Sequence, residues 1–208
     1  MEVHPPEHPI HSVRDFFMHL FTITIGLLIA LGLEGLVEAA HNRHLLHTAE
    51  INLHDEIRDN RTLLAHDEAT LTTSQQDIEK NIALLQAARA HQPITGSLSS
   101  QWKWNGMQLA AWETARNTGA IALMPYDDAQ SYSIIYRQQS LMDDQALLYI
   151  RDIYHSSSAL EGRKLSDLQP AELDAMIASS QQAIADLRLL QDLIRGLDHL
   201  YQRSTVNP

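Results

Sequence analysis

A long apolar run stands out near the beginning of the chain. Residues 16–33 read FFMHLFTITIGLLIALGL, which is 18 positions without a formal charge. As a helix rising about 1.5 Å per residue, this run would be ~27 Å long, close to the hydrocarbon thickness of a bilayer. Extension to Val37 leaves room for some tilt. The pattern therefore predicts a membrane-spanning helix over residues 16–37, with the lipid bilayer as its surroundings.

Two other kinds of segment share this pattern, namely the buried core helix of a soluble protein and a cleaved signal peptide. Soluble cores rarely need so long a run that is apolar on all sides. A signal peptide needs a basic region before its apolar core, and here Arg14 is offset by Asp15. We expect a single-pass anchor that follows an irregular tail over residues 1–15, with Ser12 or Asp15 as the helix cap. Arginine counts on the two sides of the span leave its orientation undecided.

The chain beyond the anchor has a helical pattern. Residues 41–90 contain neither glycine nor proline, so we expect a long stalk helix over residues 38–92. Apolar residues recur along it at intervals of seven: Ile57, Leu64, Leu71, Ile78 and Leu85. The companion row starts apolar and becomes polar: Leu46, Leu53, Asn60, Asp67, Ser74 and Asn81. A two-stranded coiled coil tolerates few polar core positions, so this pattern favours a helix that packs a narrow apolar stripe against other helices.

The remaining chain predicts further helices. A loop with proline and glycine follows at residues 91–97, and Pro125 and Pro170 are each placed to open a helix at its first turn. Alternation typical of strands is absent from the sequence. We predict an all-α fold, in which one transmembrane helix continues into the stalk and packs with about three further helices in a bundle over residues 99–208.

Three tryptophans lie close together at the start of this bundle: Trp102, Trp104 and Trp112. Such residues more often fill a bundle core, and Trp112 with Met107 and Leu109 suits that interpretation. A ligand pocket and a second membrane interface are the alternatives.

Composition narrows the classes of function. The chain has 26 acidic and 15 basic residues, for a net charge of −11, which argues against nucleic-acid binding. Cysteine is absent, so disulfides, thiolate catalysis and cysteine-held metal clusters are excluded. The sequence contains no P-loop, dinucleotide-binding glycine motif, His-Glu-x-x-His motif or Gly-x-Ser-x-Gly elbow. We therefore predict no catalytic residues and a protein that is not an enzyme.

Several segments resemble a known group of proteins. Residues 25–34 (IGLLIALGLE), residues 111–120 (AWETARNTGA), Leu123-Met124 and residues 132–136 are similar to segments of a broad group of uncharacterised bacterial single-pass membrane proteins. The group has no established activity. The resemblance implies a location in the bacterial inner membrane and favours a bundle on the extracytoplasmic side.

One face of the anchor carries most of its chemistry. At 100° per residue, a single stripe holds His19, Thr22, Gly26, Ala30 and Glu34. The small pair Gly26 and Ala30 would let two helix backbones approach closely in lipid. We interpret the stripe as a helix interface or a pore-facing surface. In the alternative interpretation, His19 and Glu34 simply lie at the two membrane interfaces.

Histidines suggest one candidate metal site. Eight of the 12 histidines fall in the first 54 residues, and Glu38, His41 and His44 follow one another at helical spacing. A di-metal carboxylate bundle needs two Glu-x-x-His pairs, and this chain has one, so a transition-metal site would have to form across subunits. Otherwise these are polar residues at the headgroup level. No cofactor is required by the sequence, and a transition metal is the single candidate.

These features suggest a non-enzymatic, membrane-anchored helical scaffold or accessory subunit. Such a protein would act through a homo-oligomer or by docking to a larger membrane complex. The alternative is a homo-oligomeric ion channel lined by the polar face of the transmembrane helix.

Overall fold

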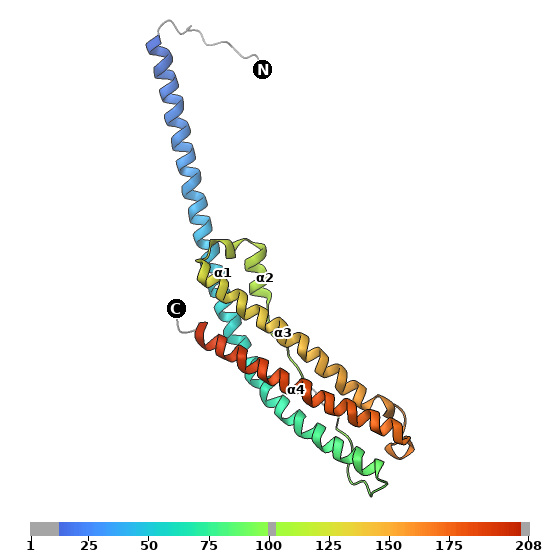
Figure 1. The fold of residues 1–208 in the computed structure, drawn as a ribbon. Coiled ribbons are helices and arrows are strands. Elements are labelled where there is room, and N and C mark those ends of the chain that lie inside the picture. The colour runs from blue at the N-terminus through green and yellow to red at the C-terminus, as the bar shows by residue number, and fades with distance from the viewer. Residues whose placement is uncertain (1–12, 100–102, 205–208) are drawn as a thin grey trace, which may run out of the picture. The chain divides into compact units, whose positions relative to one another are not determined.

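The computed structural model describes residues 13–99 and 103–204, and every regular element within these ranges is helical (Figure 1). A long N-terminal apolar helix is followed by further helices that pack against its second part, which confirms the predicted all-α class. In chain order the elements are α1 (Val13–Arg89), α2 (Ala110–Asn117), the 3₁₀ turn η1 (Ala120–Leu123), α3 (Tyr126–Ser157), the 3₁₀ turns η2 (Ser158–Leu160) and η3 (Leu165–Asp167), and α4 (Pro170–Ser204).

Helix α1 is 77 residues long. It begins at Val13, so the last three residues of the predicted irregular tail are helical, and Ser12 with the rest of that tail lies outside the described residues. Asp15 occupies the first turn, where a negative charge suits the helix dipole, and is not the cap. The helix ends at Arg89 in a Schellman-type turn: His91 has a φ of 52°, and the Gln92 N–H bonds to the Ala87 carbonyl at 2.9 Å.

The chain divides into two compact units, residues 1–48 and residues 49–208. In the first unit, the described part is the beginning of α1. Its residues 16–37 are exposed throughout, including large apolar side chains such as Phe21, Ile23 and Leu36. Among the described residues, this is the one segment long and apolar enough to cross a bilayer.

The second unit is a bundle of the rest of α1 with α3 and α4. Helix α4 runs antiparallel to both partners. On the α1 side, Arg61 pairs with Asp198 at 3.6 Å, while Arg89, near the far end of α1, pairs with Asp174 at 2.9 Å. On the α3 side, the side-chain amides of Gln138 and Gln145 reach the main-chain carbonyls of residues 193 and 186. Figure 1 shows α3 and α4 side by side along this length.

The apolar seam predicted on the stalk lies in the core of this bundle. Ile57, Leu64, Leu71, Ile78 and Leu85 are all buried. Helix α4 contributes buried residues at helical spacing, namely Leu187, Leu190, Ile194, Leu197 and Tyr201. The seam therefore packs against other helices of the same chain, as its narrow width suggested.

The proline prediction is confirmed for Pro170, whereas Pro125 is the cap residue of its helix and not part of the first turn. Pro125 immediately precedes α3, and Pro170 is the first residue of α4. Proline suits the position of Pro170 because its fixed φ fits the first turn and its missing N–H has no partner there. Between α2 and η1 the chain turns at Gly119, whose φ of 79° strongly favours glycine.

The start of the predicted bundle differs from expectation, because the described residues between Leu98 and α2 form no regular element. We call residues 98–99 and 103–109 the strap. Its contacts on α1 move from Asn81, which meets Ser99, back to Asn60, which meets Gln108. The strap thus returns along α1, and α3 can then run in the same direction as α1.

Candidate functional site

The predicted anchor stripe lies on exposed helix surface. His19, Thr22, Gly26, Ala30 and Glu34 follow one another along α1 and are all exposed. A Cβ added at Gly26 would meet no atom within 4 Å. This face is therefore open to a neighbouring helix or to lipid.

The threonine on this stripe is already engaged within its own helix. The Thr22 hydroxyl donates to the Met18 carbonyl at 2.9 Å, and Thr24 makes the same kind of bond to Leu20 at 2.8 Å. Such bonds let a hydroxyl enter an apolar environment, because its donor stays satisfied without water. His19 and Glu34 are then the stripe residues with polar groups to offer a partner.

The candidate metal ligands lie on successive turns of α1. Glu38, His41 and His44 are exposed side chains of the first unit. Within residues 13–99 and 103–204, no three histidine or carboxylate side chains come together as a metal-binding group. A site built from these residues stays a prediction that involves more than one chain.

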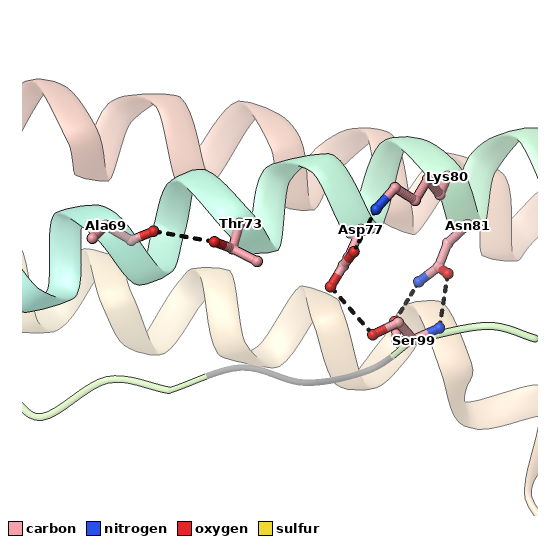
Figure 2. Close-up of polar contacts among 6 residues, drawn as sticks. All are labelled: Ala69, Thr73, Asp77, Lys80, Asn81 and Ser99. Atoms are coloured by element: carbon pink, nitrogen blue, oxygen red, sulfur yellow. Dashed lines mark hydrogen bonds and ion pairs between the residues drawn. The ribbon is translucent and has the colours of Figure 1, made fainter.

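A second row of α1 has a role that the sequence did not reveal. Asn60 and Asn81 each hold the main chain of one strap residue by its N–H and its carbonyl. Asn60 donates to the Gln108 carbonyl and accepts from the Gln108 N–H, both at 2.7 Å. Asn81 accepts from the Ser99 N–H at 2.9 Å and donates to the Ser99 carbonyl (Figure 2). Each side-chain amide therefore pairs with the strap as a neighbouring strand would.

Two carboxylates hold the middle of the strap from different helices. Asp67 of α1 accepts from the main-chain N–H of Asn105 at 3.3 Å and from its side-chain amide. Asp143 of α3 accepts from the Trp104 indole N–H at 3.1 Å, and the main-chain N–H of Met107 acts to lower the pKa of its carboxyl group. Burial raises the pKa of both carboxyl groups, and these hydrogen bonds offset only part of that effect.

Another carboxylate, the buried Glu56, holds the beginning of α2. It accepts from the Ala111 N–H at 2.7 Å and the Trp112 N–H at 3.4 Å. The cap position, Leu109, has no capping side chain, so Glu56 of α1 supplies the missing acceptor from a distance. The Tyr136 hydroxyl also donates to Glu56 at 2.7 Å. Burial, together with the neighbouring carboxylate, raises the pKa of Tyr136.

Aromatic packing closes this region. Trp112 stacks on Tyr136 with ring centroids 4.9 Å apart and planes 8° from parallel, and the Arg116 guanidinium lies 5.9 Å from the Trp112 centroid. Trp104 is half-buried beside Asp143, and Trp102 lies outside the described residues. Two of the three tryptophans therefore pack within the second unit.

An open groove of about 860 Å³ lies between α2 and α3 beside this stack. Its walls carry Arg116 and Arg137 together with Glu113 and Asp144, so both charges are present. The mixed charges of its walls therefore do not indicate whether the groove would bind an anion or a cation.

The row of clamping residues left a signal in the sequence. Asn60, Asp67, Ser74 and Asn81 follow one another every seven residues beside the apolar seam. The repeat correctly placed them next to the core. That three of them meet the strap, rather than another helix, follows only from the three-dimensional arrangement.

Comparison of the chain with protein-family models, with curated proteins and with solved structures finds no match.

Proposed function

We propose that the protein is a non-enzymatic helical scaffold or accessory subunit, anchored by one transmembrane helix in a bacterial inner membrane. One observation carries this proposal. Residues 16–37 expose an apolar surface on every side of α1, apart from a stripe of small and polar residues. So large an apolar surface is unfavourable in water and is accommodated by a bilayer.

The stripe supports an action through association. In lipid, the hydrophobic effect does not drive helices together, so close backbone packing at small residues and polar contacts become important. Gly26 and Ala30 are the small residues that allow close backbone packing. His19 and Glu34 provide the polar contacts. The partner is a second copy of the chain or a helix of a larger membrane complex, with the bundle on the extracytoplasmic side.

The test uses the full-length chain in a mild detergent. Its mass is measured by light scattering, and co-purifying proteins are identified by mass spectrometry. We expect a fixed multiple of the protomer, or a stoichiometric complex, that is lost in the Gly26→Leu/Ala30→Leu variant. Gly35→Leu is the matched control, because at 100° per residue Gly35 lies on the opposite side of the helix. It should retain the association.

Two results would overturn this proposal. One is a chain that is monomeric without a stoichiometric partner, or whose association is unaffected by Gly26→Leu/Ala30→Leu. The other is ion flux into liposomes that Glu34→Gln abolishes, which would replace the scaffold by the channel alternative.

A further inference from the structure

The strap is attached at three places by two chemical kinds of side chain. Its ends are held at the main chain of Ser99 and Gln108 by the amides of Asn81 and Asn60, which do not titrate. The middle of the strap is held by Asp67 and Asp143, whose carboxyl groups do titrate. The middle attachment can therefore change with pH, while the main-chain contacts that the two amides make at the ends stay the same.

The two middle carboxylates come from different helices and lie on the same short stretch of the strap. Asp67 is fully buried on α1, and Asp143 is half-buried on α3. The ion pairs of the described residues include neither of them. The direct contacts of these two carboxylates are therefore N–H donors, and no ion pair among the described residues balances their charge.

Neighbouring charges also change the pKa values of these two carboxyl groups. Burial is the main influence that raises the pKa of Asp143, and the charges of Asp144 and Asp67 raise it further. His66 of α1 and Lys103 of the strap act in the opposite direction on Asp67. From α4, the titratable group that interacts with Asp143 is Tyr201.

We propose that the middle of the strap is a pH-dependent contact, closed when Asp67 or Asp143 carries a proton and opening more often when both are ionised, while the ends held by Asn60 and Asn81 do not respond.

The direction of the pH effect depends on whether the closed or the open strap binds protons more tightly. Opening the strap would return the two carboxyl groups to water, where an aspartate has a pKa of about 3.9. The closed state raises both pKa values, so protons bind it more tightly. The preference for the closed state is complete below the ordinary aspartate pKa and is lost as the pH rises through the raised values. Acid thus tightens the attachment that the strap makes between α1 and α3.

The test is amide hydrogen exchange, resolved to single residues, on the full-length chain in detergent micelles. Exchange is measured from about pH 4 to pH 8 and corrected for the intrinsic chemical rate. We expect the protection of the Asn105 and Met107 amides to fall about threefold or more with rising pH. The Ser99 and Gln108 amides report the ends and should keep constant protection.

Variants separate this device from general pH sensitivity. Asp67→Asn/Asp143→Asn should abolish the pH dependence at the Asn105 and Met107 amides, because the asparagine side chains that replace the two aspartates do not titrate. Asp77→Asn is the matched control on α1. Asp77 reaches the Ser99 hydroxyl at 3.4 Å rather than the middle of the strap, so this variant should keep the dependence (Figure 2).

The proposal is overturned if all four amides respond equally to pH, or if the dependence persists in the double variant. Should the double variant fail to fold, Asp143→Asn alone decides the matter. This variant leaves the contacts of Asp67 in place and should at least halve the pH response.

Discussion

The Tyr136 hydroxyl on α3 donates to the Glu56 carboxylate on α1 at 2.7 Å, while the same carboxylate accepts two N–H groups from the first turn of α2. One buried side chain thus joins three helices. Removal of Glu56 leaves three donors without their acceptor. Removal of the Tyr136 hydroxyl takes away one donor and leaves the other two bonds intact.

We therefore expect Glu56→Ala to lower the free energy of unfolding by about 3 kcal/mol or more, and Tyr136→Phe by about 1.5–3 kcal/mol. Urea unfolding, followed by circular dichroism on the full-length chain in detergent, measures both. A double-mutant cycle should show that the effects are not additive. Independent, additive losses would show that the two side chains do not form a stabilising contact.

The strap clamps predict a difference between two asparagines of the same helix. Asn60→Ala leaves the N–H and carbonyl of Gln108 without their partner, and we expect a loss of about 1–3 kcal/mol. Asn52→Ala is the matched control, because Asn52 is exposed and such changes usually stay within about 0.5 kcal/mol. Equal effects of the two substitutions on the urea midpoint would contradict the clamp.

The apolar seam makes a prediction about packing. Leu71 is only 1 % exposed, and its truncation to alanine would leave a cavity between α1 and its partners. Leu71→Ala should cost about 2–5 kcal/mol. Ile51, on the same helix, is 48 % exposed, so Ile51→Ala should change the free energy of unfolding much less. Similar losses for both would mean that the seam is not a packed core.

Acid should weaken one contact near the beginning of α4. Hydrogen bonds from Arg163 and from the Gln169 N–H lower the pKa of Glu172 to about 2. Because the folded pKa is lowered, the stabilisation is present above the ordinary glutamate pKa and is lost as the pH falls towards 2.

Thermal unfolding at two pH values tests this contact. Glu172→Gln should lower the midpoint relative to the natural chain at pH 7, and this difference should shrink at about pH 2.5. Glu161→Gln, in the same connection between α3 and α4, is the control and should have little effect at either pH. A difference for Glu172→Gln that is equal at both pH values would contradict the lowered pKa.

Much of the fold could be predicted because it depends on local signals. The absence of glycine and proline from residues 41–90 indicated an unbroken helix, and Pro125 and Pro170 marked the beginning of α3 and α4. The strap could not be predicted in this way. Its irregular backbone is stabilised by side chains about 18 to 48 residues away in sequence, such as Asn81 and Asn60, rather than by its own residue preferences.

The candidate sites also differ in whether they depend on local sequence or on distant contacts. The anchor stripe follows from helical periodicity, so the position of Gly26 and Ala30 on one face was accessible from sequence. Its partner is not encoded in that periodicity. The carboxylate contacts of Glu56 and Asp143 bring together distant parts of the chain, so only the three-dimensional arrangement reveals them.

The asparagine clamps have a consequence for how this chain tolerates mutation. At both ends of the strap, Asn60 and Asn81 contact main-chain atoms, which every residue supplies, and the side chain of Gln108 is exposed. The strap can therefore exchange most of its side chains at these points without losing its place. Proline at position 99 or 108 is the exception, because it lacks the N–H that the clamp needs. Variation at positions 99 and 108 is thus restricted by backbone chemistry, whereas positions 60 and 81 need a side chain that both donates and accepts a hydrogen bond.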